Sequence, residues 1–249
     1  MVGIDFDQLW RYGLGVFWPF VRIMALFAAS PVLSTRGVPN RFKILMALAL
    51  AGVIAPSIDV TGAGDFLATL LQQIFVGVVV GFAMRIVFAA IEFAGDLAGL
   101  QIGIGFATFV DPVNNRQTPI IGSFYSVLAT LIFLSLDGHL MLIAQLIDSF
   151  QVIPISPHAT GGFDLLSITG WGTELFRLGF TLALPIITSI LICNFAMGIM
   201  ARVAPQLSIF TVGFAMMMMA GLAMIWLTLP YLGAPLQRAI TTPLWQVVR

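Results

Sequence analysis

Long apolar runs recur along this sequence, and they limit its possible folds more than any other feature. A helix needs about 20 mostly apolar residues to cross the hydrocarbon core of a bilayer, and six segments approach or exceed that length. Only 9% of the 249 residues are charged, whereas a soluble domain carries about 25%. We therefore expect one all-α integral membrane domain over residues 1–249. The predicted segments are Tyr12–Leu33, Phe42–Ile58, Phe66–Ile91, Pro119–Leu136, Leu175–Met200 and Leu207–Leu232.

Prolines predict that several of these segments are kinked or broken. Pro19 and Pro185 lie inside the first and fifth segments, where proline removes a helix hydrogen bond. The first segment also contains Arg22, which is expected to face protein or an interface because a charge facing lipid is costly. The second segment is barely long enough to span and ends near Pro56, and the sixth is expected to end at Pro230.

The stretch between the fourth and fifth segments, Asp137–Glu174, is the longest less apolar region of the chain. Its first part, Leu140–Ile153, is too short to span a bilayer. We expect that part to form a helix at the interface or at half depth. The remainder contains prolines and glycines and is predicted to be a loop.

Positive charge predicts the orientation of the segments. The loop 34–43 holds Arg36, Arg41 and Lys43, the densest positive cluster in the chain. Cytoplasmic loops carry an excess of Lys and Arg, so this loop and the turn at 201–206 are placed in the cytoplasm. Six spans would then leave both termini outside.

A glycine-rich stretch, Gly95–Pro112, reads GDLAGLQIGIGFATFVDP. Each of its four glycines weakens a helix by roughly 1 kcal/mol relative to alanine, although a four-residue glycine spacing also lets another backbone approach closely. Beyond the last glycine, β-branched residues and a pre-proline aspartate argue against helix. Non-helical backbone at membrane depth must be buried in protein or line a water-filled passage. The stretch thus predicts either a pore-lining or plugging loop, or a close-packing face followed by an ordinary loop. The close-packing glycines are Gly95, Gly99 and Gly103, and the fourth glycine is Gly105.

Three charged residues, Arg85, Glu92 and Asp96, are predicted to lie in or near the membrane on one face of a helix. Glu92 and Asp96 repel each other if both are ionised. Intramembrane carboxylates often mark a proton or ion path. A structural charge pair at a membrane boundary or subunit contact is the alternative.

The sequence offers no sign of an enzyme. His139 and His158 are isolated, and Cys193 stands alone inside an apolar run, so neither a metal site nor a disulfide is expected. No Ser-His-Asp set or phosphate loop is present, and we expect no cofactor. The formal net charge is zero, which gives no indication of nucleic-acid binding.

Four passages resemble the FliR family, the export-gate subunit of the flagellar type III secretion apparatus, whose virulence counterpart is SctT. The match extends over essentially the whole chain, and the glycine-rich passage together with the Ala-Pro-Gln-Leu passage carries most of its specificity. The passages are Phe17–Arg22 with Ser30–Leu33 and Val38–Pro39, Gly99–Pro112, Leu136–Leu140, and Ala204–Phe210 with Gly213.

The resemblance implies one FliR-like chain that assembles with several FliP and FliQ copies into a closed export gate in the bacterial inner membrane, at the flagellar basal body. FlhB would join that gate, FlhA would supply neighbouring machinery, and unfolded flagellar proteins would pass through. Hairpins of the assembled gate could then lie above the bilayer plane instead of spanning it. A virulence-system gate subunit and a small-solute secondary transporter are the alternatives.

The glycine-rich stretch resembles the run into the family's plug loop, which would extend from Gly105 to about Thr118. Residues of this loop that would form the seal are Gly105, Phe106, Phe109, Val110, Asp111, Pro112 and Arg116.

Overall fold

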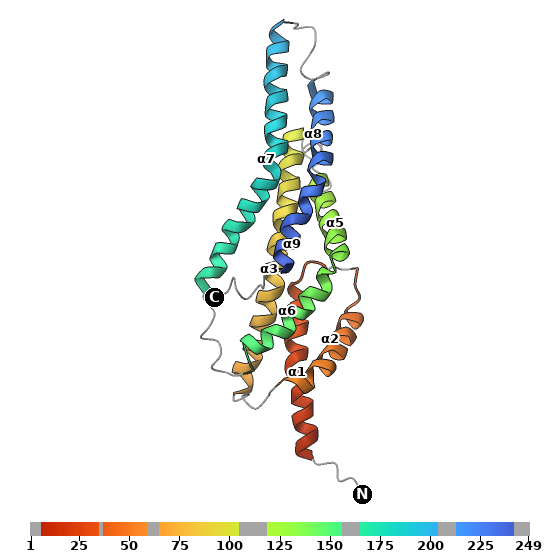
Figure 1. The fold of residues 1–249 in the computed structure, drawn as a ribbon, viewed down its shortest axis with the longest axis vertical. Coiled ribbons are helices and arrows are strands. Elements are labelled where there is room, and N and C mark those ends of the chain that lie inside the picture. The colour runs from red at the N-terminus through yellow and green to blue at the C-terminus, as the bar shows by residue number, and fades with distance from the viewer. Residues whose placement is uncertain are drawn as a thin grey trace, which may run out of the picture. The chain divides into compact units, whose positions relative to one another are not determined.

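The computed structural model describes residues 6–34, 37–58, 65–104, 119–155, 165–203 and 213–241. Every regular element within these ranges is a helix, which confirms the predicted all-α fold (Figure 1). The elements are α1 (Phe6–Ala29), α2 (Asn40–Ile54), η1 (Ala55–Ser57), α3 (Phe66–Ile102), α5 (Ile120–Ser135), α6 (Gly138–Val152), α7 (Leu165–Val203), α8 (Phe214–Thr228), η4 (Leu229–Leu232) and α9 (Gly233–Thr241).

Four of the described helical stretches are long and apolar enough to cross a membrane, and α5 with α6 could form a fifth, bent span. The part of α1 whose side chains are described, Gly13–Ala29, is a shorter apolar helix. Of the six segments that the sequence predicts, the fourth corresponds to α5, which has 16 residues and could span only together with α6. The first corresponds to α1, which has 24 residues. The four stretches are Asn40–Ser57, Phe66–Ile102, Gly170–Val203 and Phe214–Ala239.

The predicted end of the third segment at Ile91 is wrong, because α3 continues without a break to Ile102. Gly95 and Gly99 therefore lie inside a helix, although each weakens it intrinsically. Tertiary packing commonly outweighs helix propensity, and both glycines face α5 at close range. The resistance to helix expected of Gly95–Pro112 thus does not apply to its first part.

Two further boundaries differ from the sequence expectation. The region predicted to be a loop up to Glu174 is already helical from Leu165, where α7 begins. The predicted end of the last segment at Pro230 is wrong. Pro230 lies in the first turn of η4, and α9 follows η4 directly. Proline is tolerated in the first turn of a helix, where its missing N–H has no partner to lose.

The described chain divides into two compact units. The first contains α1, α2, α3 up to Ile86, and α6. Within it α1 packs along α2, and Trp18 of α1 forms a buried cluster with Phe150 and Ile155 at the end of α6. Large aromatic side chains thus fix α1 to the end of α6.

The second unit contains α3 from Val87, α5, α7 from Gly172, and α8. Phe88 of α3 meets Phe133 of α5 edge to face, with ring centroids 5.6 Å apart. Phe93 makes the same type of contact with Phe176 and Phe180 of α7. In the second unit, therefore, α5 and α7 both pack against α3.

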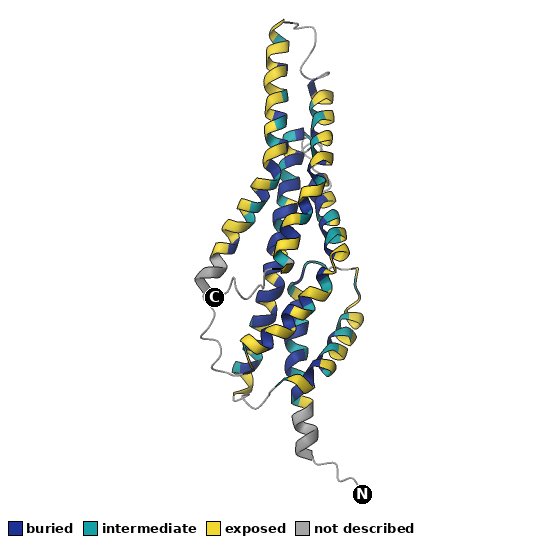
Figure 2. Cartoon of the chain, viewed as in Figure 1, coloured by how far each residue is buried: buried dark blue, intermediate teal, exposed yellow. Residues whose placement is uncertain are grey.

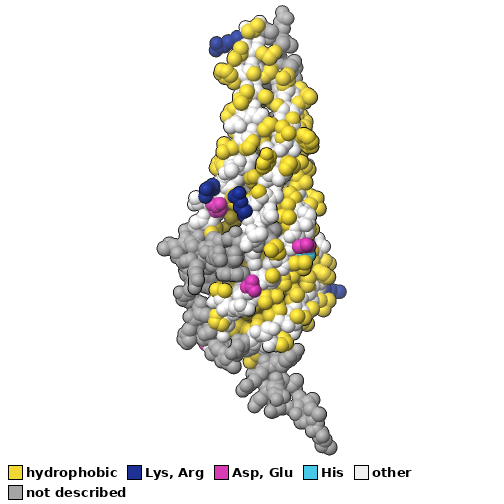
Figure 3. Space-filling view, viewed as in Figure 1, with side chains coloured by type: hydrophobic (Ala, Val, Ile, Leu, Met, Phe, Trp, Pro, Cys, Tyr) yellow, Lys and Arg dark blue, Asp and Glu magenta, His cyan; other side chains and the backbone are white. Residues whose placement is uncertain are grey.

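Burial is distributed unevenly among the long helices (Figure 2). The most apolar window of α3 is 67% buried, whereas those of α7 and of the stretch that starts at α8 are 22% buried. Large apolar side chains such as Phe195 and Trp226 are consequently more than two-thirds exposed. Figure 3 shows many hydrophobic side chains and few charged groups on the described part of the visible face. Surfaces of this kind suit lipid or other membrane subunits.

Candidate functional site

The most elaborate polar arrangement among the described residues surrounds Arg22, deep in the first unit. The Arg22 side chain is fully buried, and its three nitrogens donate to three different groups. Nε donates to Oε1 of Gln73 at 2.7 Å, and Nη1 donates to Oγ of Ser149 at 3.0 Å. Nη2 donates to the carbonyl oxygen of Ile153 at 3.0 Å. The prediction that Arg22 faces protein is confirmed.

Two further contacts extend this arrangement. The guanidinium carbon of Arg22 lies 3.8 Å from the centroid of the Phe150 ring, a cation–π contact. Gln73 donates to Gln72, whose amide nitrogen lies 3.4 Å from the carbonyl oxygen of Pro154. We call Arg22, Gln72, Gln73, Ser149 and Phe150, with the carbonyls of residues 153 and 154, the buried arginine cluster.

Every oxygen that accepts from Arg22 is neutral, and no acidic side chain in the described ranges forms a salt bridge with it. Burying a cation costs several kcal/mol in real proteins. A hydrogen bond to a charged group contributes about 1.5–3 kcal/mol, and a desolvated cation–π contact about 2 kcal/mol. Three such bonds and the Phe150 ring are thus of the right size to offset the burial.

A close approach of α1 and α3 brings Arg22 to its partners. A Cβ atom on Gly81 would lie 2.8 Å from both the Cβ of Ala29 and the carbonyl oxygen of Leu26. A Cβ on Gly77 would lie 2.7 Å from the Cβ of Ala25 and would also clash with the Arg22 carbonyl. Glycine at both positions lets the helix backbones touch, and Gln73 lies one turn before Gly77 on the same helix.

The predicted close-packing glycines meet α5 in the second unit. A Cβ on Gly95 would lie 2.9 Å from the Cα of Gly122 and 2.9 Å from the carbonyl oxygen of Ile121. A Cβ on Gly99 would lie 3.3 Å from a side-chain carbon of Ile121. Gly95 is thus placed where the two backbones approach, and Gly99 where a side chain packs.

Gly103 lies apart from this face. Its φ angle is 87°, in the left-handed region that L side chains rarely adopt, and its N–H reaches back to the carbonyl of Leu100 at 3.2 Å. Gly103 therefore terminates α3, whereas the sequence had suggested a third step of a packing ladder.

The three predicted membrane charges do not form one network. Arg85 and Glu92 are exposed, and Asp96 is half-buried. The Asp96 carboxylate lies against Gly122 of α5, and its Oδ1 is buried with no hydrogen-bond partner among the described residues. None of the three forms a salt bridge within the described ranges. No proton relay through these carboxylates is visible in the described structure.

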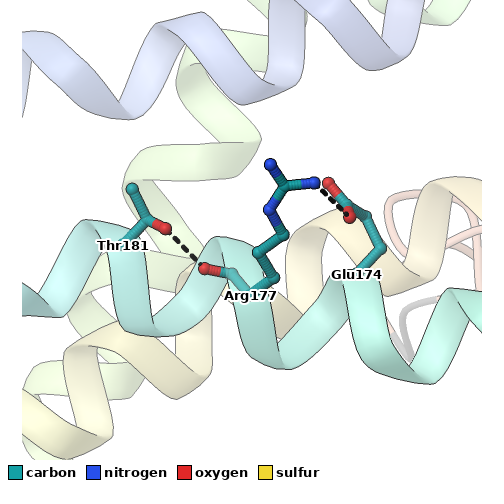
Figure 4. A network of polar contacts seen from close by, with 3 residues as sticks. All are labelled: Glu174, Arg177 and Thr181. Carbon is teal, nitrogen blue, oxygen red and sulfur yellow. Dashed lines mark hydrogen bonds and ion pairs between the residues drawn. The ribbon is translucent and has the colours of Figure 1, made fainter.

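Among the described residues, Arg177 and Glu174 of α7 form a salt bridge at 3.6 Å (Figure 4). Both side chains are largely exposed, at 76% and 51%, and Thr181 donates to the Arg177 carbonyl one turn further on. Exposed pairs of this kind contribute little to stability.

The predicted plug loop lies outside the described residues. The predicted seal residues that therefore fall outside the described ranges are Gly105, Phe106, Phe109, Val110, Asp111, Pro112 and Arg116. The described residues on either side are firmly held: Ile102, the last residue of α3, is fully buried against Gly221, and Ile121 near the start of α5 is buried against Gly99. In the described part of the chain, no group of three or more His, Cys, Asp or Glu side chains could hold a metal ion.

Sequence reasoning missed two features of the first unit. Gly77 and Gly81 have the same four-residue spacing as Gly95 and Gly99, so this spacing could have predicted that another helix packs closely against them. The hydrogen-bond partners of Arg22 were not visible, because Ser149 and Ile153 are more than 120 positions away in the chain.

Known proteins resemble the chain over most of its length. A family model described as "Bacterial export proteins, family 1" matches residues 14–242. The flagellar biosynthetic protein FliR of Escherichia coli (strain K12) is 40% identical over 218 residues, which cover 86% of this chain and 84% of that protein. FliR of Pectobacterium carotovorum subsp. carotovorum is 43% identical over the same shares. FliR of Bacillus subtilis (strain 168) is 29% identical over 78% of each chain.

Proposed function

The chain belongs to family 1 of the bacterial export proteins, among the FliR proteins of flagellar biosynthesis, and on this basis we propose that it forms and seals the export channel together with FliP-like and FliQ-like subunits. It is a flagellar export-gate subunit and a multi-pass protein of the inner membrane. The observation that carries the proposal is the family match, which runs from residue 14 to residue 242 and so includes the predicted plug loop.

The proposed seal is the loop Gly105–Thr118. A channel wide enough for an unfolded chain must be filled at rest, or it would leak ions. Phe106, Phe109 and Val110 supply bulk that excludes water, and Pro112 limits how far a helix can continue. A loop without regular hydrogen bonding can also be displaced at modest cost, as a gate requires.

The described structure supports this proposal at the ends of the loop. Gly103 ends α3 with a left-handed backbone, and α5 begins at Ile120. The contacts of Gly95 and Gly99 with the start of α5 hold these two helices together. The predicted loop thus lies between two helix ends that pack firmly against each other.

Further partners and the absence of catalysis belong to the same proposal. The family is a structural component of the export gate, and we expect no catalytic activity and no cofactor. FlhB is expected to join the gate, FlhA to act beside it, and unfolded flagellar proteins to be its cargo. Copurification tests the assembly: a gate subunit should be recovered with FliP-like and FliQ-like proteins, whereas a small-solute transporter should be stable alone.

A length-preserving substitution tests the seal. Replacing Phe106, Phe109 and Val110 together by serine should make the purified complex conduct small ions in a planar bilayer, with the chain still present in the complex. Gln117→Ser and Thr118→Ser in the same loop exchange one polar side chain for another, so they serve as the control and should leave the bilayer tight. A complex that assembles normally and stays non-conducting with all three serines would refute the sealing role.

A further inference from the structure

We propose that Arg22 is a positioning residue that fixes the C-terminal end of α6 against α1 and α3. This role goes beyond the sealing function proposed above and does not depend on which subunits join the chain. It follows from the geometry of the buried arginine cluster within the first unit.

The contacts of Arg22 use the shape of the guanidinium group as well as its charge. Three nitrogens reach three separate oxygens, which belong to Gln73 on α3 and to Ser149 and Ile153 on α6. The flat group also lies over the Phe150 ring. A lysine ammonium is a compact point charge on a flexible stem, so it cannot hold all three acceptors at these distances and cover the ring as well.

Two of the three acceptors lie at the C-terminal end of α6. Ser149 is in its last turn, and Ile153 directly follows its last residue. The last carbonyls of a helix lack intrahelical partners and carry partial negative charge. A buried cation at this end satisfies the Ile153 carbonyl and is attracted by the same charge.

Tertiary contacts must decide where α6 lies. The helix has 15 residues, and isolated helices of about that length are marginal in water. Asp137, just before it, has a left-handed backbone with a φ angle of 54°, so α6 begins as a separate helix instead of continuing α5. At its other end the arginine cluster acts together with the contact of Ile155 with Trp18.

Hydrogen–deuterium exchange of the full-length chain, purified in detergent together with the subunits that copurify with it, tests the role locally. Breaking a charged hydrogen bond should let the end of α6 open more often, so Arg22→Lys and Arg22→Met should each raise exchange over residues 147–153 about tenfold or more. Exchange in α8, which belongs to the second unit, should stay at the wild-type rate. Arg177→Met removes an arginine that is 76% exposed and is the matched control, expected to change nothing in α6.

A second variant separates positioning from general folding. Gln73→Leu combined with Arg22→Met removes Arg22 together with its acceptor on α3, so the Gln73 amide oxygen is not left buried without a donor. The double variant should accumulate better than Arg22→Met alone, yet residues 147–153 should still exchange fast. If Arg22→Met does not accumulate, Ser149→Ala removes one acceptor only and should give a smaller rise at the same residues.

Two results would overturn the proposal. Wild-type exchange at the end of α6 in Arg22→Met would show that the contacts of Arg22 do not hold this end in place. A uniform rise across α6 and α8 would show that Arg22 supports the fold in general, without a particular role for α6.

Discussion

Gly95 and Gly99 lie one turn apart on α3 but meet α5 in different ways. Gly95 faces backbone atoms, the Cα of Gly122 and the carbonyl oxygen of Ile121, both 2.9 Å from where its Cβ would be. Gly99 faces the Ile121 side chain at 3.3 Å. A side chain can shift by a few tenths of an ångström, whereas two helix backbones can move apart only together. The two glycines therefore differ in how much a methyl group would disturb the contact.

We predict that Gly95→Ala lowers the stability of the chain and that Gly99→Ala does not. Overpacking costs about 1–3 kcal/mol, which exceeds the roughly 1 kcal/mol that alanine gains in helix propensity. At Gly99 these two effects should nearly cancel, whereas Gly99→Leu should block assembly or export. The thermal midpoint of the chain, purified with the subunits that copurify with it, measures the alanine effects, and motility measures the leucine effect.

Gly198 on α7 provides the control, because nothing lies within 4 Å of a Cβ built there. Gly198→Ala should raise the midpoint slightly through propensity alone. Equal midpoints for Gly95→Ala and Gly198→Ala would contradict the close approach of α3 and α5 at Gly95.

The break between α5 and α6 shows how a single backbone position separates two elements. Asp137 has φ 54° and ψ 28° and is the N-cap position of α6. Its carbonyl accepts from the N–H groups of Leu140 and Met141, at 2.9 and 3.2 Å. Aspartate and asparagine tolerate this left-handed conformation better than most residues, and glycine adopts it freely.

We predict an order of stability at position 137 that follows backbone preference. Asp137→Gly and Asp137→Asn should be close to neutral, whereas Asp137→Val should cost about 1–2 kcal/mol, since a β-branched residue is strained in this region. Thermal unfolding of the chain, purified with the subunits that copurify with it, measures this order. A valine variant as stable as the glycine variant would mean that the backbone here is not left-handed.

Local sequence patterns predicted which segments form helices better than they predicted where each helix begins and ends. The length of the apolar runs predicted the helices correctly, because a membrane helix needs such a run whichever helices lie beside it. The end of α3 was misplaced because the cost of Gly95 and Gly99 is local, whereas the α5 contact that offsets it is distant in sequence. For the same reason Arg22 could be expected to face protein, but its partners on α6 could not be named.

At the scale of the whole molecule, α2 is the best helix for testing whether a segment crosses the membrane and which of its ends is cytoplasmic. Together with η1, α2 forms the stretch Asn40–Ser57, which is 18 residues long and only 22% buried. This stretch can therefore face lipid over most of its surface. Arg41 and Lys43 stand at its first turn, and the loop after it carries no Lys or Arg. Cytoplasmic loops are the ones rich in Lys and Arg, so its N-terminal end is placed in the cytoplasm.

We predict that a cysteine at the start of α2 and one just before α3 react with a membrane-impermeant thiol reagent from opposite sides. The native cysteine is first replaced by Cys193→Ser, and the probes are Asn40→Cys and Asp65→Cys, both at exposed positions. Asn40→Cys should resist the reagent in whole cells and react in inverted vesicles, and Asp65→Cys should do the reverse. Labelling of both probes from one side would mean that α2 does not span, as expected for a hairpin raised above the bilayer. Labelling of Asn40→Cys from outside together with Asp65→Cys from inside would reverse the orientation and show that positive charge does not govern it.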